Sequence, residues 1–188
     1  MAKNSYLCNI YNRNPSAFMS QDKILTFKNL TPWHLDQILN LQDECVLTLP
    51  DTRLYYPLTK GELLESLSED VVIGAFDSAR LVAVAVIIVN RDSPRNLAGE
   101  SGIRPENTFT FDAVMVSPRW RGRGLQRTLL NQCVEIARKR GVHQVLATVS
   151  PDNAHSLNNF IRQGFEVLST TEKYDGLVRH VVGYTIPG

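Results

Sequence analysis

A strand that passes into a helix through a glycine-rich junction constrains the fold of this chain most strongly. The run TFTFDAVMV (108–116) is typical of a strand that stops before Pro118, and RTLLNQCVEIARKRG, which ends at Gly141, has apolar residues at helical spacing. Between them lies RGRGLQ (121–126). Glycine permits a sharp turn, whereas a helix start with free N–H groups and two arginines can hold an anion. These six residues alone leave both interpretations open.

The elements on either side predict a mixed α/β sheet covered by helices. A long polar stretch, residues 90–107, separates two of the strands, and we expect disorder or substrate contact there. The expected elements are a strand at 24–30, a helix from Thr31 and Pro32, a helix from near Thr59, a hairpin of VVIGAF and RLVAVAVIIV, the strand 108–116, the helix to Gly141, a strand at 142–149, a helix closed by Gly164, and two strands joined at Asp175–Gly176.

Length and composition fit one domain. The chain has 188 residues, 43% of them hydrophobic, and we assign residues 1–22 to a flexible leader and 23–188 to the domain. Twenty basic residues balance nineteen acidic ones, and no apolar run approaches the roughly 20 residues of a membrane span, so neither nucleic acid nor a membrane is an expected partner. Three distant cysteines, Cys8, Cys45 and Cys133, indicate a cytoplasmic protein without disulfides or a metal site.

Two common phosphate-binding motifs do not match the junction. A Walker loop needs Lys and then Ser or Thr after the second glycine, and Leu125 follows Gly124 here. A dinucleotide GxGxxG motif needs a third glycine where Arg127 stands.

Two blocks resemble the GNAT superfamily of acetyl-CoA-dependent N-acetyltransferases. VMVSPRWRGRGLQRTLL is similar to its pyrophosphate loop, Arg/Gln-x-x-Gly-x-Gly/Ala. Gln126 stands at the last position of that pattern, where the family has glycine or alanine, and its longer side chain is tolerable if it points away from the loop. ATVSPDNAHSLNNFIRQGF is similar to a second family segment, with Phe160 where tyrosine is frequent. The resemblance covers roughly residues 24–186, chiefly 112–165. It implies a single GNAT-like domain in which strands 108–116 and 142–149 splay apart.

The resemblance also implies how acetyl-CoA would be held. Its pantetheine arm would pair with backbone in the splayed gap, and a backbone N–H there would polarise the thioester carbonyl. Asn153 would bind the arm or cap the helix that follows, or both. The cofactor-binding residues are therefore Val114, Met115, Val116, Arg121, Gly122, Arg123, Gly124, Leu125, Gln126, Asn153, Ser156 and Phe160.

An acceptor amine must lose a proton before it attacks, so we look for a base. Asp112 is the first candidate, because its even spacing from Val114 and Val116 predicts that all three lie on one face of the strand. The alternative role for Asp112 is that of a solvated or salt-bridged carboxylate without a part in catalysis. Glu100 and Glu106 are weaker candidates. In the family the tyrosine at the position of Phe160 protonates the departing thiolate.

Phenylalanine cannot donate that proton. Tyr174 or Tyr184 could donate the proton instead, although packing is the commoner role of such tyrosines. His155 and His180 have no visible partners and no GxSxG motif is present, so direct transfer is favoured over an acyl-enzyme.

The acceptor is expected to be a primary amine of a small molecule, bound between the first two helices, the long loop and the final hairpin. Tyr55 and Tyr56 could stack on it or anchor their loop. The alternative function is a non-catalytic acyl-CoA-binding sensor, motivated by Gln126 and Phe160, and a homodimer is left open.

Overall fold

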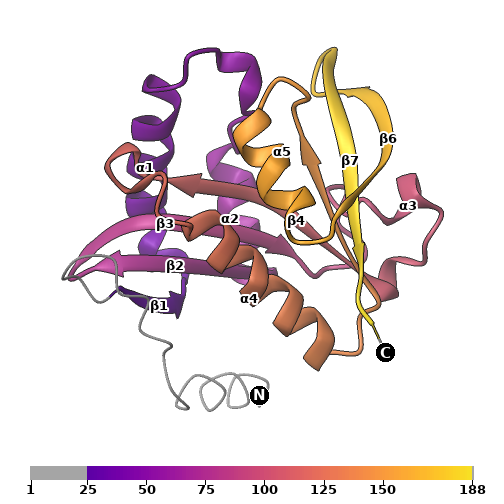
Figure 1. Ribbon diagram of the computed structural model, residues 1–188. Coiled ribbons are helices and arrows are strands. Elements are labelled where there is room, and N and C mark those ends of the chain that lie inside the picture. The colour runs from indigo at the N-terminus through magenta and orange to yellow at the C-terminus, as the bar shows by residue number, and fades with distance from the viewer. Residues whose placement is uncertain (1–24, 188) are drawn as a thin grey trace, which may run out of the picture.

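The computed structural model describes residues 25–187. They form one seven-stranded sheet in the order β1-β2-β3-β4-β5-β7-β6, flanked by helices (Figure 1). The expected leader, residues 1–22, lies outside the described residues, as does Cys8. The strands are β1 (Thr26–Asn29), β2 (Val71–Asp77), β3 (Arg80–Ile88), β4 (Thr108–Val116), β5 (Gln144–Val149), β6 (Glu166–Lys173) and β7 (Leu177–Thr185).

The helices begin and end close to the residues that the sequence indicated. Thr59 caps α2 by accepting a hydrogen bond from the backbone N–H of Glu62, and Asn153 caps α5 in the same way from Ser156. The helices are α1 (Leu35–Leu47), α2 (Lys60–Glu69), α3 (Ala98–Ser101), α4 (Leu125–Lys139) and α5 (Ala154–Ile161), with short 3-10 turns η1 (Pro32–His34), η2 (Thr52–Leu54), η3 (Pro105–Asn107) and η4 (Pro118–Trp120).

The sheet is mixed, and its two middle strands separate. β4 and β5 run parallel, whereas the other neighbours are antiparallel. β4 and β5 pair over three positions only, from Thr108 opposite Gln144 to Thr110 opposite Leu146, although β4 continues to Val116 and β5 to Val149. The expected splayed pair is therefore confirmed, and it opens toward the carboxyl end of both strands.

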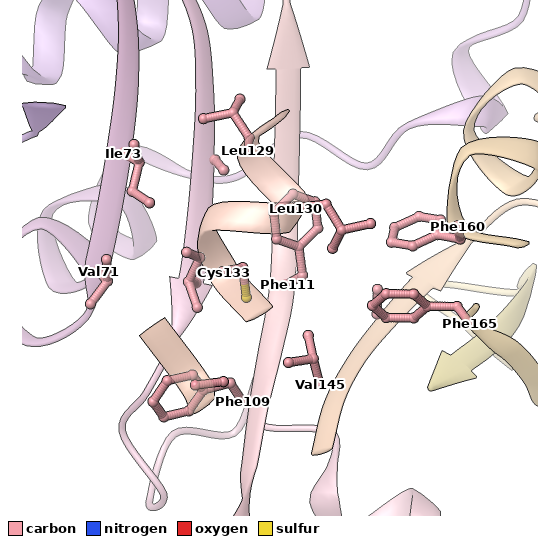
Figure 2. Close-up of a cluster of buried hydrophobic side chains, with 14 of the residues drawn as sticks. Val71, Ile73, Phe109, Phe111, Leu129, Leu130, Cys133, Val145, Phe160 and Phe165 are labelled. Atoms are coloured by element: carbon pink, nitrogen blue, oxygen red, sulfur yellow. The ribbon is translucent and has the colours of Figure 1, made fainter. Parts of the chain in front are cut away.

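Two apolar cores cover the two faces of the sheet. α4 and α5 pack on one face, where Leu129, Leu130, Phe111 and Phe160 meet (Figure 2). α1 and α2 pack on the other face, where Ile38 and Leu63 are fully buried. Removal of this apolar surface from water is what holds the layers together.

A β-bulge at Asp112 changes which face of the sheet each β4 side chain meets. Phe111 pairs with Ile87 and Ala113 pairs with Val86, so Asp112 has no partner on β3. Before the bulge, Phe111 lies in the α4 core; after it, Ala113 and Met115 lie in the α1–α2 core. Strict alternation therefore fails along this strand.

The long stretch 90–107 is anchored, and the expectation of disorder is wrong for its middle. Leu97 and Ala98 are buried, and the Leu97 N–H donates to Thr110 Oγ1 at 2.9 Å. Arg95 donates hydrogen bonds to Ser66 of α2 and to Asp112 of β4. Among the described residues, no helix is long and apolar enough to cross a membrane.

Candidate active site

The loop before α4 presents a row of backbone donors. Gly122 and Gly124 both have φ of +77°, a left-handed conformation that side chains with a Cβ rarely adopt. Within the described part of the chain, the N–H groups of residues 122–127 donate to no protein acceptor. The helix dipole adds partial positive charge at the same point, because α4 begins at Leu125. The loop therefore has the donors and the charge to bind an anion such as a diphosphate.

The two loop arginines occupy different surroundings. The Arg121 guanidinium donates to Thr48 Oγ1 at 3.1 Å and to the Val116 carbonyl at 3.4 Å, which ties the loop to the end of α1. Arg123 lies over the Trp120 ring, 4.7 Å from its centroid. Arg121 thus shapes the loop, whereas Arg123 keeps its charge at the surface.

Gln126 points toward α5 rather than into the loop. Its Nε2 donates to Ser156 Oγ at 2.9 Å, and its Oε1 accepts from Asn159 Nδ2 at 2.8 Å. Gln126 thus has the orientation in which a long side chain is tolerable at this position. The hydrogen bond between Gln126 and Ser156 joins α4 to α5.

The splayed end of β4 directs backbone groups into the gap. The Ser117 N–H donates to the Val82 carbonyl on β3 at 2.9 Å. Because the polar groups of an antiparallel pair alternate in direction, those of Val114 and Val116 face away from β3, toward β5. The Val116 carbonyl already accepts from Cys45 Sγ at 3.3 Å. Met115, predicted with them, is buried among the α1–α2 core residues.

The predicted shared face of Asp112 with Val114 and Val116 is wrong because of the bulge. Val114 and Val116 pack against the α4 core. Asp112 instead meets Arg95, whose Nη1 donates to its Oδ2 at 2.8 Å, and Arg95 also donates to Ser66 Oγ of α2 at 2.6 Å.

Asp112 is therefore a buried, ion-paired carboxylate on the α1–α2 side of the sheet. Burial raises the pKa of Asp112 to about 6, although the Arg95 cation opposes that shift. Arg95 also lies within 4.0 Å of carboxylate oxygens of Glu65 and Asp70. The Arg95 guanidinium is thus shared among three carboxylates. With its pKa raised to about 6 by burial, the Asp112 carboxylate can take up a proton near that pH.

Tyr174 lies beside the open edge of β5. Its hydroxyl is 3.1 Å from Thr148 Oγ1, and its ring stacks on Tyr56 with the centroids 4.7 Å apart. Tyr55 instead anchors its loop, because its hydroxyl donates to Gln42 Oε1 at 3.0 Å and burial raises its pKa. The structure thus brings the η2 segment and the β6–β7 turn together beside the open end of β5, in the region (the acceptor side) where the acceptor is expected to bind.

Phe160 belongs to the core rather than to the ligand-binding surface. It is 2% exposed and packs edge-on against Phe111 and Phe165, which Figure 2 shows. Its predicted contact with a cofactor has no counterpart in these surroundings. Tyr184, the other candidate acid, stacks on Phe165 on the α4–α5 side.

Sequence reasoning missed Arg95, Thr148 and Arg179. Arg95 is 17 residues from Asp112, Thr148 is 26 from Tyr174, and Arg179 is 126 from Arg53, whose carbonyl it binds. No local motif marks such pairs. Among the described residues, no group of three or more His, Cys, Asp or Glu could hold a metal ion.

Comparison with known proteins agrees with this architecture. Residues 35–165 match the acetyltransferase (GNAT) family. An 81-residue segment is 28% identical to an uncharacterized N-acetyltransferase of Methanocaldococcus jannaschii; it spans 43% of this chain but only 36% of that relative.

Solved structures share the fold at low sequence identity. The ribosomal-protein-S18-alanine N-acetyltransferase of Escherichia coli superposes with a TM-score of 0.68 at 17% identity, over 88% of this chain and 96% of the other. An acetyltransferase of Salmonella typhimurium, solved with its cofactor acetyl-CoA, superposes with a TM-score of 0.67 at 18% identity, over 87% and 95%.

The splayed mixed sheet and the free N–H groups before α4 fit an acyltransferase. The match over most of the chain then gives the family: this protein belongs to the GNAT family of acetyltransferases.

Proposed function

We propose that this protein transfers an acetyl group from acetyl-CoA to a primary amine of a small molecule, by direct attack and without an acyl-enzyme. The observation that carries the proposal is the row of six unpaired N–H groups at residues 122–127, beside strands that separate. The near-neutral charge of the chain supports a small acceptor over a nucleic acid. Its sparse cysteines, of which Cys45 and Cys133 are buried and unpaired, support a reducing compartment such as the cytoplasm.

The residues present fit acetyl-CoA. The loop amides and the start of α4 would hold the diphosphate, with Arg123 nearby. Val114 and Val116 would pair with the pantetheine arm through the groups that face the gap. Asn153, whose Oδ1 already accepts from the Ser156 N–H, keeps its Nδ2 for a ligand. When bound, acetyl-CoA supplies an acetyl group activated as a thioester.

Three groups would then serve the transfer. The Val114 N–H would donate to the thioester oxygen, an interaction of the kind that mutagenesis of oxyanion holes values at about 3 to 4 kcal/mol. Asp112 would take the proton that the acceptor ammonium must lose, since it lies on the α1–α2 side and is ionised above pH 6. Tyr174 would donate a proton to the departing sulfur, in place of the hydroxyl that Phe160 lacks.

Release of free thiol from acetyl-CoA over a panel of primary amines tests the proposal. We expect amine-dependent thiol release, equimolar with the N-acetylated product. Tight binding of coenzyme A with no turnover on any amine would instead establish the second candidate, a non-catalytic acyl-CoA sensor. That alternative is favoured by one observation, the burial of Phe160 at the usual tyrosine position.

A further inference from the structure

A buried arginine lies at the acceptor side of the sheet. Arg179 of β7 is 4% exposed. Its Nη2 donates to the Arg53 carbonyl in η2 at 2.8 Å, and its Nη1 donates to the Val178 carbonyl at 2.9 Å. Both acceptors are neutral, and a guanidinium has five N–H donors, so the fork is only partly used.

No acidic side chain of the described residues forms a salt bridge with Arg179. The neighbouring Asp51 is engaged by Arg53, at 2.7 Å. Arg95, the other largely buried arginine near the sheet, meets three carboxylates within 4.0 Å. A buried charge without a counter-ion is costly, and burial accordingly lowers the pKa of Arg179. The buried guanidinium of Arg179 would therefore be stabilised by an anion from outside the chain.

The surroundings of Arg179 connect it to the splayed gap. The guanidinium lies 5.8 Å from the centroid of the Tyr174 ring. The Tyr174 hydroxyl is 3.1 Å from Thr148 on β5, near the open end of that strand. Tyr56 stacks on the same ring, with the two centroids 4.7 Å apart. A molecule held by Arg179 along this aromatic wall would thus extend toward the point where β4 and β5 separate.

We propose that Arg179 binds a carboxylate of the acceptor, so that the preferred substrates are amines whose own carbon skeleton carries a carboxylate, the chemistry of amino acids. This inference rests on the proposed function and names its substrate class. A carboxylate matches the planar fork of a guanidinium and supplies the missing single negative charge.

The first test compares matched acceptors. Initial rates of thiol release are measured for amino acids of increasing separation between amine and carboxylate, namely glycine, β-alanine, 4-aminobutyrate and branched α-amino acids, each beside its primary amide. We expect at least one acid to exceed its amide on the order of 100-fold in kcat/KM, the value for a buried charge pair. Equal rates for every acid and amide overturn the inference and leave the acetyltransferase proposal standing; no turnover on any amine removes both.

The second test uses three variants and the preferred acid–amide pair. Arg179→Met keeps the length but removes the charge, so it should raise KM for the acid and leave the amide unchanged. Arg179→Lys keeps a charge without the fork and should recover part of the preference. Arg162→Met, an exposed position after α5, is the matched control and should change neither rate. An equal loss on acid and amide in Arg179→Met would assign Arg179 to holding η2 against β7, and the substrate inference would be wrong.

Discussion

At the scale of single residues, Gly122 and Gly124 give the anion-binding loop its shape. Both adopt a left-handed backbone conformation just before α4 begins. An added Cβ at Gly124 would meet only the flexible end of Arg127, at 3.5 Å. Backbone strain rather than a steric clash therefore makes glycine necessary here.

We predict that Gly124→Ala weakens binding of coenzyme A about tenfold and destabilises the fold by about 1 kcal/mol, the cost of one left-handed residue. Isothermal titration calorimetry and urea unfolding measure the two effects. Gly99→Ala is the matched control, because nothing lies within 4 Å of its added Cβ and its φ is not left-handed. Undiminished affinity in Gly124→Ala would show that the loop does not hold the diphosphate.

Asp112 gives the reaction its expected pH dependence. Its pKa of about 6 means that the carboxylate is ionised above that pH and protonated below it. We predict that kcat/KM falls as pH drops through about 6, since a protonated Asp112 cannot accept the ammonium proton.

Asp112→Asn should remove that acid limb and lower kcat/KM by about 10² to 10⁴-fold, as measured from pH 5 to 9. Asp43→Asn, an exposed carboxylate on α1, serves as the control. A variant that keeps the wild-type profile would leave Asp112 only its structural ion pair with Arg95.

At the scale of elements, the β6–β7 hairpin completes the acceptor side. Arg179 joins β7 to η2, and Tyr174 joins the turn to β5. These links connect segments far apart in the chain to the edge of the splayed gap. The proposed function therefore assigns both substrate contact and proton donation to this hairpin.

We predict that Tyr174→Phe lowers kcat about 100-fold while binding of coenzyme A is unchanged, because the hydroxyl is lost and the stack on Tyr56 remains. Steady-state kinetics and calorimetry check the two halves of this prediction. Tyr184→Phe is the comparison, since its ring packs on Phe165 away from the acceptor side. Equal rates for the two variants would exclude Tyr174 as the acid.

The bulge in β4 shows where element-level sequence reasoning fails. The strand bounds 108–116 could be predicted in full, because β-rich residues and Pro118 mark them. The orientation of Asp112 could not, because a single unpaired residue reverses the alternation beyond it. No residue type in FTFDAVMV signals that insertion.

At the scale of the whole molecule, each face of the sheet has its own apolar core. Leu125, at the start of α4, packs in the α4–α5 core, whereas Ala113, next to Asp112, packs in the α1–α2 core. A ligand that binds only the folded state stabilises that state by RT ln(1 + L/Kd), where L is the free ligand concentration.

We predict that coenzyme A at about 100 times its Kd raises the melting temperature by about 5 to 10 °C, because about 2.7 kcal/mol of linkage shifts a domain of this size by that amount. Differential scanning calorimetry measures the shift, and adenosine, which lacks the diphosphate, serves as the control. The same shift from adenosine alone would contradict binding at residues 122–127.

Phe160 belongs to the stability of the whole fold. We predict that Phe160→Ala destabilises the protein by about 3 to 5 kcal/mol in urea unfolding, because it leaves a cavity beside Phe111 and Phe165. Val178→Ala, at a half-exposed site, should cost far less. A small effect at Phe160 would mean that the core there is not closely packed.

The sequence by itself determined the order of elements, the glycine junction and the family, because hydrophobic periodicity, helix caps and left-handed glycines are local properties that neighbouring residues encode. Only the tertiary structure decided where Gln126 points, which face Asp112 meets, and which distant residues Arg95, Thr148 and Arg179 contact. Those facts depend on sheet register and on contacts between residues as far as 126 positions apart, which no local pattern contains.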